Sequence, residues 1–489
     1  MDLIPPRQQR YLFTDFRHIM CGDLEWRSPD GRAIPVAGPP QPPVDVVADP
    51  DWLTYGIRLV AQPAAKTDPL PPGAPRGSRV IYEHGVYRSW SINADYPPGQ
   101  DLGSYSHAQA KTVHISYTES TDGFDWVEKA RSPIAPRGVS GFDGFTAFID
   151  PHGAESERYK AIYMALVPED KQQAVREEYA RLHPRHQDWR ILKRSAPYGI
   201  YGAVSPDGLH WESLAEPLMI HYADTDNTML WDEWLGKYVM YTRMYPYDRR
   251  VIARAEAEDF RQWGPVSPLI WPGLDNPHED IYTNACSTYP GLPAYRFMFP
   301  MCYQRDTQRS DVRMFSSADG LLWNRVPGGP VIAPGPAGAW DSEFIHAGKD
   351  LVPFGAGRVA VPYFGTPYPH KYPRWPHVLE SFRGGWAYWP EGRLCAVAAE
   401  QEGHFNTFWL QPAGRALRLN LRTAAAGEVR VGIFGTLGRA IADCAPLHGD
   451  HPAMTVHWGG QTDIGTPEGE PVILQFKLRH AELFGFEWV

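Results

Sequence analysis

Hydrophobic positions along this chain fall into short apolar runs that are separated by polar turns. In five segments an apolar run ends in a turn and is followed by a second run that contains Lys or Arg and an aromatic residue. Two short runs joined by a turn are typical of an antiparallel β-hairpin. The five segments are residues 80–90, 145–165, 228–245, 287–303 and 342–365.

A second pattern, Ser-x-Asp-Gly-x-x-Trp, follows three of these hairpins. Its copies begin at Ser120, Ser205 and Ser317, and a degenerate copy ends at Trp263. Asp-Gly is a turn dipeptide in which glycine takes a positive φ, and the tryptophan is expected to cover the neighbouring sheet. Without one charged insertion the copies are about 50–60 residues apart, which is close to one four-stranded propeller blade.

The repeat predicts a five-bladed β-propeller in residues 1–385, with one blade for each hairpin. The fifth hairpin has no Ser-x-Asp-Gly motif after it, so another segment has to complete its blade. Two segments are candidates for this closing strand, residues 378–389 and residues 10–19.

The last hundred or so residues have a different pattern. Apolar and polar positions alternate through a short turn in residues 415–435, and they alternate again in residues 471–489, as in antiparallel hairpins. These segments predict a C-terminal β-sandwich over residues 386–489. One charged, helix-like insertion at about residues 165–192 fits a lid, an oligomer contact or a solvated surface helix.

Composition supports an all-β chain. Of the 489 residues, 45 are Gly and 48 are Pro, which favour turns, and 18 Trp, 25 Tyr and 20 Phe argue against disorder. The net charge of −10 argues against broad contact with nucleic acid, which needs a basic surface. Neither a secretory signal nor an apolar run of about 18 residues is visible, so we expect a cytoplasmic protein without a membrane span. The five cysteines form no C-x-x-C motif and are expected to be buried thiols.

Acidic residues recur where the first strand of a hairpin is expected to begin. They occur in four of the five units and are Asp143, Asp224, Asp226, Asp280, Asp341 and Glu343. In a propeller these strand starts converge on the central axis, where neighbouring carboxylates raise the pKa of at least one of them. A protonated carboxyl and an ionised partner are the pair that glycosidic cleavage requires. A single Asp before a strand can equally make an Asx turn, so the prediction rests on the recurrence.

Polar residues accompany these acids. Asn227, Tyr282, Asn284 and His346 are candidates for hydrogen bonds to sugar hydroxyls, and Arg243 is a candidate for a contact to a carboxylate. A lone buried histidine is more often a hydrogen-bonded core residue than a ligand, so His346 is a candidate only because of its neighbours.

Aromatic residues near the strand starts are candidates for stacking on sugar rings. They are Trp340, Trp231, Trp271 and the segment 363–376, whereas most other tryptophans are expected to pack between blades. No cofactor or bound metal is expected, since the sequence has no nucleophile elbow, P-loop, dinucleotide-binding or zinc-protease motif. The oxygen ligands at the strand starts would suit a structural Ca²⁺, although no dedicated calcium loop is visible.

Several of these segments together resemble one known group. They are YLFTDFRHI at 11–19, the repeated Ser-x-Asp-Gly-x-x-Trp, residues 226–243, DIYTNA at 280–285, and HGD-x(5)-VHWGG-x-TDI at 448–464. They resemble bacterial proteins similar to the N-terminal domain of glycoside hydrolase family 32, within the five-bladed propeller hydrolases that include families 43, 62 and 68. The resemblance covers nearly the whole chain and implies a propeller followed by a family-32-like sandwich.

The resemblance also implies an activity. Members of these families cleave or transfer furanosides, with a nucleophile or base Asp, a stabilising Asp and an acid Glu in different blades. The family-32 motif W-M-N-D-P-N-G and clear R-D-P and E-C motifs are absent from this sequence. By position we assign Glu343 as general acid, Asp143 or Asp226 as nucleophile or base, and Asp280 as an orienting or stabilising carboxylate.

We therefore expect a glycoside hydrolase that is exo-acting on a short furanoside. Two alternatives stay open at this point. A non-catalytic carbohydrate-binding or scaffold propeller would use the acids only to cap strands. A glycosyltransferase or phosphorylase on the same fold would need cationic groups near the axis, for which the sequence offers only Arg243.

Overall fold

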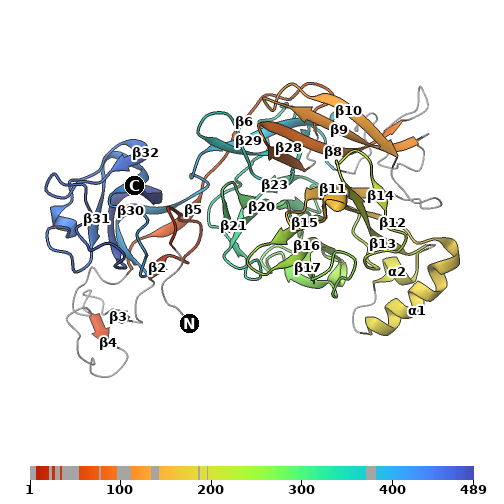
Figure 1. Ribbon diagram of the computed structural model, residues 1–489, viewed down its shortest axis with the longest axis horizontal. Helices are drawn as coiled ribbons and strands as arrows, with labels where there is room; N and C mark the ends of the chain where they lie inside the picture. Colours follow the sequence, from red (N-terminus) through yellow and green to blue (C-terminus); the bar gives the residue numbers. More distant parts are fainter. Residues whose placement is uncertain are drawn as a thin grey trace. The chain divides into compact units, whose positions relative to one another are not determined.

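The computed structural model of the chain consists mostly of antiparallel strands, as expected, and divides into two compact units (Figure 1). The larger unit contains residues 63–325 and 330–389, and the smaller unit contains residues 1–62, 326–329 and 390–489. The structure describes residues 7–20, 25–27, 33–35, 54–75, 79–95, 112–133, 143–184, 188–194, 196–370 and 381–489.

Three sheets of the larger unit are four-stranded meanders in which each strand pairs with the next along the chain. The first two strands of each sheet form one of the expected hairpins. The strands are β7 (Val80–Glu83), β8 (Val86–Asp95), β9 (Thr112–Ser120) and β10 (Val127–Pro133); β11 (Asp143–Ile149), β12 (Tyr159–Leu166), β13 (Tyr198–Ser205) and β14 (Glu212–Ser213); β15 (Thr228–Asp232), β16 (Lys237–Met244), β17 (Val251–Ala257) and β18 (Ser267–Ile270).

The fourth group of strands is split into two sheets that use the same stretches of chain. One sheet consists of β19 (Glu279–Ile281), β22 (Met301–Gln304) and β23 (Ser310–Val312). The other consists of β20 (Cys286–Tyr289), β21 (Leu292–Met298), β24 (Phe315–Ser317) and β25 (Asn324–Arg325). Because β19 precedes β20, β21 precedes β22 and β23 precedes β24, each pair is one interrupted strand. The expected hairpin in residues 287–303 is confirmed by the pairing of β20 with β21.

The last sheet of the larger unit is closed by a short strand from near its N-terminal end. Its strands are β26 (Phe344–Ala347), β27 (Val352–Pro353), β28 (Arg358–Thr366), β29 (Arg383–Pro390) and β6 (Ala65–Lys66). The segment 378–389 contributes β29, but the closing strand beyond it is β6, which pairs with β29. The alternative of closure by residues 10–19 is wrong, because β1 (Arg10–Leu12) pairs with a strand of the smaller unit.

The core of the larger unit lies between neighbouring sheets and is rich in aromatic side chains. Phe148 of the second sheet packs in one buried cluster with Tyr238 of the third. Trp90 of the first sheet packs in another cluster with Tyr159 and Tyr201 of the second. Part of the aromatic surplus of the sequence therefore fills the spaces between sheets.

The Ser-x-Asp-Gly-x-x-Trp turns have the predicted conformation. In the first copy the Ser120 hydroxyl accepts a hydrogen bond from the Gly123 amide (2.9 Å), and Gly123 has a φ of 83°. The Trp126 indole donates to the Gly123 carbonyl (3.0 Å), which also accepts from Trp386 of the last sheet (2.7 Å). In the second copy the Gly208 carbonyl accepts from Trp90 of the first sheet (2.7 Å). The motif therefore ties neighbouring sheets together.

Substitution of Gly208 by alanine is expected to lower the free energy of unfolding by about 2–4 kcal/mol, because the clash adds to the backbone cost of a positive φ. Its φ is 77°, and a Cβ atom would lie 2.9 Å from Cζ2 of Trp90. The matched control is Gly236→Ala, because Gly236 has a φ of 61° but no heavy atom within 4 Å of the position that a Cβ atom would take. That control should show only the backbone cost of about 1 kcal/mol. Denaturant unfolding of both variants measures the difference, and equal losses would contradict the packing argument.

The smaller unit is built on one seven-stranded antiparallel sheet. Its strands are β1, β2 (Ile19–Met20), β5 (Arg58–Ala61), β30 (Cys395–Thr407), β31 (Leu417–Ile433), β32 (Asp450–Thr455) and β33 (Leu474–Trp488). Two further short strands, β3 (Glu25–Arg27) and β4 (Ala33–Pro35), pair with each other. The boundary near residue 386 was expected to leave residues 1–385 in the propeller, whereas β1, β2 and β5 add N-terminal residues to this sheet. The sandwich itself stays a prediction.

The alternating segments of the smaller unit form long strands. Residues 415–435 were expected to be a hairpin, but they form the single strand β31, whose pairing with β33 shifts between Thr423 and Glu428. Extra residues at this point are accommodated as a bulge rather than as a reversing turn. Residues 471–489 likewise contribute one strand, β33.

The charged insertion forms two helices, as its composition indicated. These are α1 (Gln172–Leu182) and α2 (Trp189–Leu192), and each buries one side chain, Tyr179 and Ile191 respectively. No helix among the described residues is long and apolar enough to cross a membrane. Four of the five cysteines are buried free thiols, as expected, and Cys21 lies outside the described residues.

Candidate active site

The predicted acids lie at or beside the first strand of their sheets. Asp143 opens β11, Asp226 precedes β15, Asp280 lies in β19, and Glu343 immediately precedes β26. In a meander the end of the second strand and the start of the third lie at the same edge as the start of the first. Residues at the end of the second strand and at the start of the third therefore lie at the same edge of the sheet as the acids.

Asp226 is buried in a strained and charged setting. Its φ is 52°, and its carboxylate lies 2.8 Å from Nζ of Lys349 and 3.5 Å from Nε2 of His346. Burial by itself would raise the pKa of Asp226, but the charge of Lys349 and the contact with His346 hold that pKa well below its ordinary value. Asp226 is therefore an ionised, almost fully enclosed carboxylate.

The two predicted amide ligands are occupied within the protein. The Asn227 side chain accepts from the Thr242 hydroxyl (2.6 Å) and donates to the Ala223 carbonyl (3.3 Å). The Asn284 side chain accepts from the Thr228 hydroxyl (2.7 Å) and donates to the Asp226 carbonyl, and both asparagines are buried. Their contacts fix the backbone around Asp226.

Asp224 occupies a more open position, two residues earlier. Its Oδ1 accepts from Nη1 of Arg243 (2.6 Å) and from the hydroxyl of Tyr245 (2.7 Å). Its Oδ2 accepts a longer bond from the hydroxyl of Tyr222 (3.2 Å), and the side chain is 33% exposed. Arg243 therefore does contact a carboxylate, as predicted, and that carboxylate is accessible to solvent.

Among the predicted acids, Asp143 has a raised pKa. Burial raises the pKa of Asp143 to about 7, and the negative charge of Asp224 acts in the same direction. A hydrogen bond from the Gly144 amide to Oδ1 (2.7 Å) and the charge of Arg243 oppose the rise. The residue is nevertheless partly exposed. Near neutral pH it is a carboxyl group with a proton to give.

Two guanidinium groups lie near the ring of Tyr282. The Arg243 and Arg250 guanidiniums lie 4.1 and 4.5 Å from its ring centroid, and its hydroxyl is 2.9 Å from Nε2 of His370. Asp280, which is fully buried, is held by Arg250 (2.7 Å) and Arg305 (3.0 Å). The site therefore contains more arginines than the sequence analysis identified.

Glu343 lies in a different setting from the one expected of a general acid. Both of its oxygens contact the guanidinium of Arg309, Oε1 at 2.8 Å from Nη2. Glu343 is therefore held in a bidentate ion pair. Asp341 is likewise engaged, by Lys66 (2.7 Å) and the Tyr363 hydroxyl (3.1 Å).

The aromatic residues that were predicted to stack on sugar rings lie in different environments. The Trp340 ring lies 5.3 Å from that of Tyr363, and Trp231 packs edge-on against Tyr238 at 4.9 Å. Trp271 is 44% exposed. Residues 371–376 of the aromatic segment lie outside the described residues. These rings are not brought together with Asp143 by any contact among the described residues.

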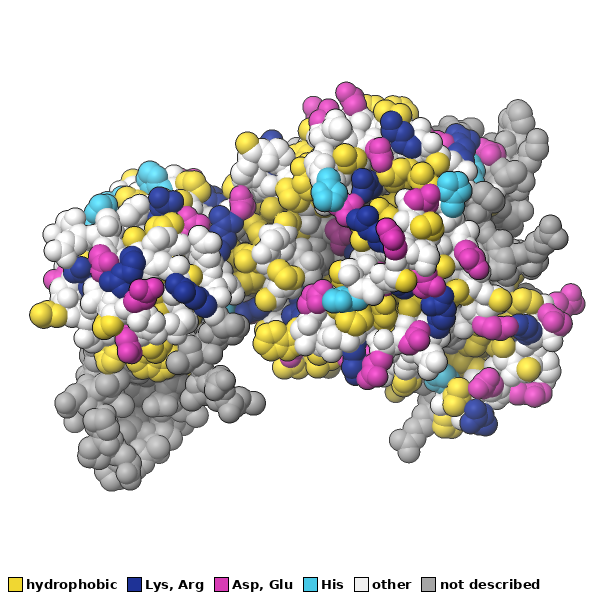
Figure 2. Space-filling view, in the orientation of Figure 1, with side chains coloured by type: hydrophobic (Ala, Val, Ile, Leu, Met, Phe, Trp, Pro, Cys, Tyr) yellow, Lys and Arg dark blue, Asp and Glu magenta, His cyan; other side chains and the backbone are white. Residues whose placement is uncertain are grey.

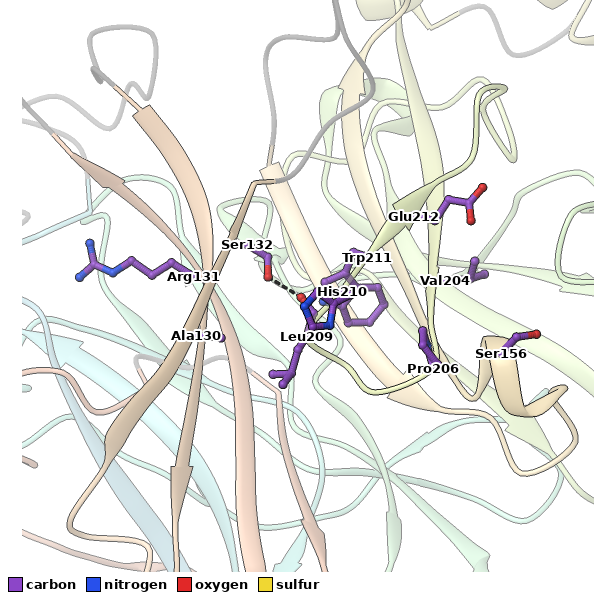
Figure 3. Close-up of a pocket in the computed structure, with 10 residues that line it drawn as sticks. All are labelled: Ala130, Arg131, Ser132, Ser156, Val204, Pro206, Leu209, His210, Trp211 and Glu212. Carbon is purple, nitrogen blue, oxygen red and sulfur yellow. Dashed lines mark hydrogen bonds between the residues drawn. The ribbon is translucent and has the colours of Figure 1, made fainter.

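Figure 3 shows the residues that line one pocket of the larger unit, which has a volume of about 560 Å³. It is lined by residues of β10 and of the turn between β13 and β14, among them Ser132, His210 and Trp211. That turn joins the third and fourth strands, so it lies at the edge opposite the strand starts. None of the predicted site residues lines this pocket.

The described residues contain no group of three or more His, Cys, Asp or Glu side chains placed to hold a metal ion. On the face that Figure 2 shows, Lys and Arg side chains are mixed with Asp and Glu over the larger unit. Neither sign of charge therefore dominates this face of the larger unit.

Neither the known family models nor the curated proteins include a match to this chain. Among solved structures, the chain is similar to the catalytic domain of a Coprinopsis cinerea family 62 α-L-arabinofuranosidase, with 11% identity, a TM-score of 0.43, and coverage of 67% of this chain and 97% of that one. It is also similar to a Bacillus subtilis family 43 arabinoxylan arabinofuranohydrolase, with 10% identity, a TM-score of 0.37, and coverage of 88% and 96%.

A third similar structure is a β-1,2-mannobiose phosphorylase from Listeria innocua, with 9% identity, a TM-score of 0.43, and coverage of 69% of this chain and 91% of that one. The chain is thus similar to solved glycoside hydrolases of families 62 and 43.

Proposed function

We propose that this chain hydrolyses glycosidic bonds, with Asp143 as the proton donor and Asp224 as the ionised carboxylate. In this proposal the meanders, the split fourth group and the sheet closed by β6 are the five blades of a propeller, and the smaller unit is an appended β-sandwich. Short furanosides, cleaved from one end, are the first substrate class to test, because the motifs of the sequence resemble furanoside-active families.

The observation that carries the proposal is the difference between two neighbouring acids. Asp143 has a pKa of about 7 because of burial and the charge of Asp224, whereas Asp224 is paired with Arg243 and Tyr245. A pair of carboxyl groups with different protonation at the same pH is what glycoside hydrolysis needs.

The chemistry divides between the two residues. Asp143 gives its proton to the oxygen of the departing group as the bond to the anomeric carbon breaks. Asp224 presents Oδ2 either to the anomeric carbon or to a water that attacks it, while Arg243 and Tyr245 hold Oδ1. Arg243 is thus a positioning residue for Asp224.

The acids given leading roles by the sequence analysis have other parts in this proposal. Asp226 and its partner Lys349 stabilise the start of β15, and Asp280 orients Arg250 and Arg305. Glu343, which the sequence analysis assigned as the general acid, forms an ion pair with Arg309 and has no catalytic role in this proposal.

A panel of nitrophenyl furanosides and pyranosides tests the proposal. Wild type is expected to release nitrophenol from at least one member, and Asp224→Asn is expected to lower kcat/KM for it by at least about 100-fold. Asp170→Asn, which changes an exposed carboxylate on the insertion, is the matched control and should stay within about twofold of wild type. A panel with no cleaved member would favour a carbohydrate-binding or scaffold role instead, whereas full activity in Asp224→Asn would contradict the role given to Asp224.

The pH dependence of wild type follows from the pKa of Asp143. Because the acid acts in its protonated form and its pKa is about 7, kcat/KM should fall as the pH rises through about 7 and approach a tenfold loss per pH unit. A rate that stays level up to about pH 9 would show that the proton comes from a group other than Asp143.

The same pKa predicts a stability effect that needs no substrate. A carboxyl whose folded pKa is raised binds its proton more tightly in the folded state, so stability is lost as the pH rises from about 4 to about 7. Asp143→Asn removes this loss and should melt at a higher temperature than wild type at about pH 8. At about pH 4 the two proteins should melt together, and an identical difference at both pH values would contradict the shift.

Phosphorolysis is a second candidate, because Arg250 and Arg305 bring two guanidinium groups together at Asp280, and Arg305 also lies 3.8 Å from Asp248. Two adjacent guanidinium groups suit a phosphate co-substrate. Addition of inorganic phosphate distinguishes the two, since a phosphorylase needs it and releases a sugar 1-phosphate. Cleavage at an unchanged rate without phosphate excludes this alternative.

A further inference from the structure

The charged insertion packs directly against the segment that leads to Asp224. Tyr179 of α1 and Ile191 of α2 belong to the same buried cluster as Leu218, Tyr222 and Ala223. Because Ala223 directly precedes Asp224, this cluster brings the insertion close to the proposed site.

Two arginines of the insertion lie on the tyrosine rings that hold Asp224. The Arg190 guanidinium is 3.7 Å from the ring centroid of Tyr245, and the Arg194 guanidinium is 4.8 Å from that of Tyr222. The hydroxyls of these tyrosines donate to Asp224 at 2.7 and 3.2 Å. Each arginine therefore contacts a tyrosine ring whose hydroxyl is hydrogen-bonded to Asp224.

The two arginines differ in their acidic partners. Arg190 pairs with Asp188 (3.5 Å) and Asp248 (3.0 Å). Arg194 is half-buried, and within the part of the chain that the structure describes no carboxylate forms an ion pair with it. Arg194 interacts with the Tyr222 hydroxyl, and the further forked donors of such a guanidinium on an aromatic face suit an oxyanion.

The position of Arg194 is fixed from the neighbouring helix. Arg176 of α1 donates from Nη2 to the carbonyl of Arg194 (2.7 Å) and from Nε to the carbonyl of Ile191 (3.3 Å). The backbone that carries Arg194 is therefore held in place, and less freedom is lost when the side chain binds a ligand.

We propose that Arg194 binds an anionic group on the substrate, either the carboxylate of a uronic acid or a phosphoryl group carried by the sugar. This inference rests on the proposed sugar-cleaving site at Asp143 and Asp224. The charge of Asp224 is paired with that of Arg243, whereas no carboxylate among the described residues forms an ion pair with Arg194, so Arg194 supplies an additional positive charge near Asp224. The insertion then acts as a specificity element rather than as a plain surface helix.

Binding of free monosaccharides to wild type tests the inference without any turnover. The probes are glucuronate, galacturonate and glucose 6-phosphate, each measured by calorimetry against neutral glucose or galactose. We expect at least one anionic probe to bind at least about tenfold more tightly than its neutral counterpart. Uronate binding alone identifies a carboxylate as the recognised group, and binding of glucose 6-phosphate alone identifies a phosphoryl group.

The variants Arg194→Gln and Lys193→Gln form a matched pair. Lys193 is exposed and precedes Arg194, so both variants lose one positive charge at nearly the same place. Arg194→Gln should lose about 10- to 100-fold in affinity for the anionic probe and little for the neutral sugar, whereas Lys193→Gln should keep both. Arg194→Lys, which keeps the charge but not the fork, should show an intermediate loss.

Two results would overturn the inference. One is that no anionic probe binds more tightly than its neutral counterpart, and the other is that Arg194→Gln and Lys193→Gln lose affinity equally. Failure of the proposed function is distinguishable, because it appears as absence of glycoside cleavage by wild type and leaves Arg194-dependent binding unaffected.

Discussion

Replacement of Asp143 by asparagine is expected to lower kcat/KM for a cleaved oligosaccharide by about 10²- to 10⁴-fold. Asparagine has nearly the same size as aspartate, and its side-chain oxygen can still accept the hydrogen bond from the Gly144 amide (2.7 Å). It has no acidic proton to give to the departing oxygen. The loss therefore measures proton donation rather than a change of shape.

Asp170→Asn is again the control, because it makes the same chemical change on an exposed surface of the insertion. The melting temperature of Asp143→Asn at about pH 6 shows whether the variant is folded. A folded variant with less than about a tenfold loss in kcat/KM would mean that no essential proton passes through Asp143.

Replacement of Lys349 by methionine is expected to lower the free energy of unfolding by about 3–5 kcal/mol near neutral pH. Lys349 is 5% exposed and lies 2.8 Å from Asp226, whose carboxylate is also buried. Methionine fills much of the same volume but removes the lysine charge, so that of the two partners only His346 still faces the Asp226 carboxylate. Denaturant unfolding of wild type and variant gives the difference directly.

The size of this effect should depend on pH. The pKa of Asp226 is lowered in the folded state, so the stability from its pairing is present above about pH 4 and is lost as the pH falls toward that lowered value. The control Lys171→Met breaks an exposed pair with Glu216 and should cost at most about 1 kcal/mol. A loss in Lys349→Met no larger than that of the control would mean that Asp226 is not enclosed as described.

The hairpins and turns could be predicted because their signals are local. Each Ser-x-Asp-Gly-x-x-Trp copy contains the donors and acceptors of its own turn, as the bonds among Ser120, Asp122 and Gly123 show. The strand β6 could not be predicted, because two residues are too few for alternation to be visible. The pairing of β1 with β33 joins opposite ends of the chain, and no local pattern records that choice.

The candidate site was predicted only in part, for a related reason. The acids at strand starts were found because their position repeats, but their protonation depends on partners from other segments. Lys349 and Arg309, which pair with Asp226 and Glu343, are far from them in sequence. Tyr245, at the end of a hairpin, was findable in principle, because second strands end where first strands begin.

Proton donation by Asp143 is best examined through the dependence of kcat/KM on the leaving group, compared between wild type and Asp143→Asn. A general acid matters most when the departing oxygen is basic and least when it leaves easily. With an alkyl or sugar leaving group, we expect Asp143→Asn to show the whole loss in kcat/KM of about 10²- to 10⁴-fold. With a dinitrophenyl leaving group, the variant should retain most of the wild-type kcat/KM. Equal losses for both leaving groups would refute proton donation by Asp143 and, with it, the assignment of the site.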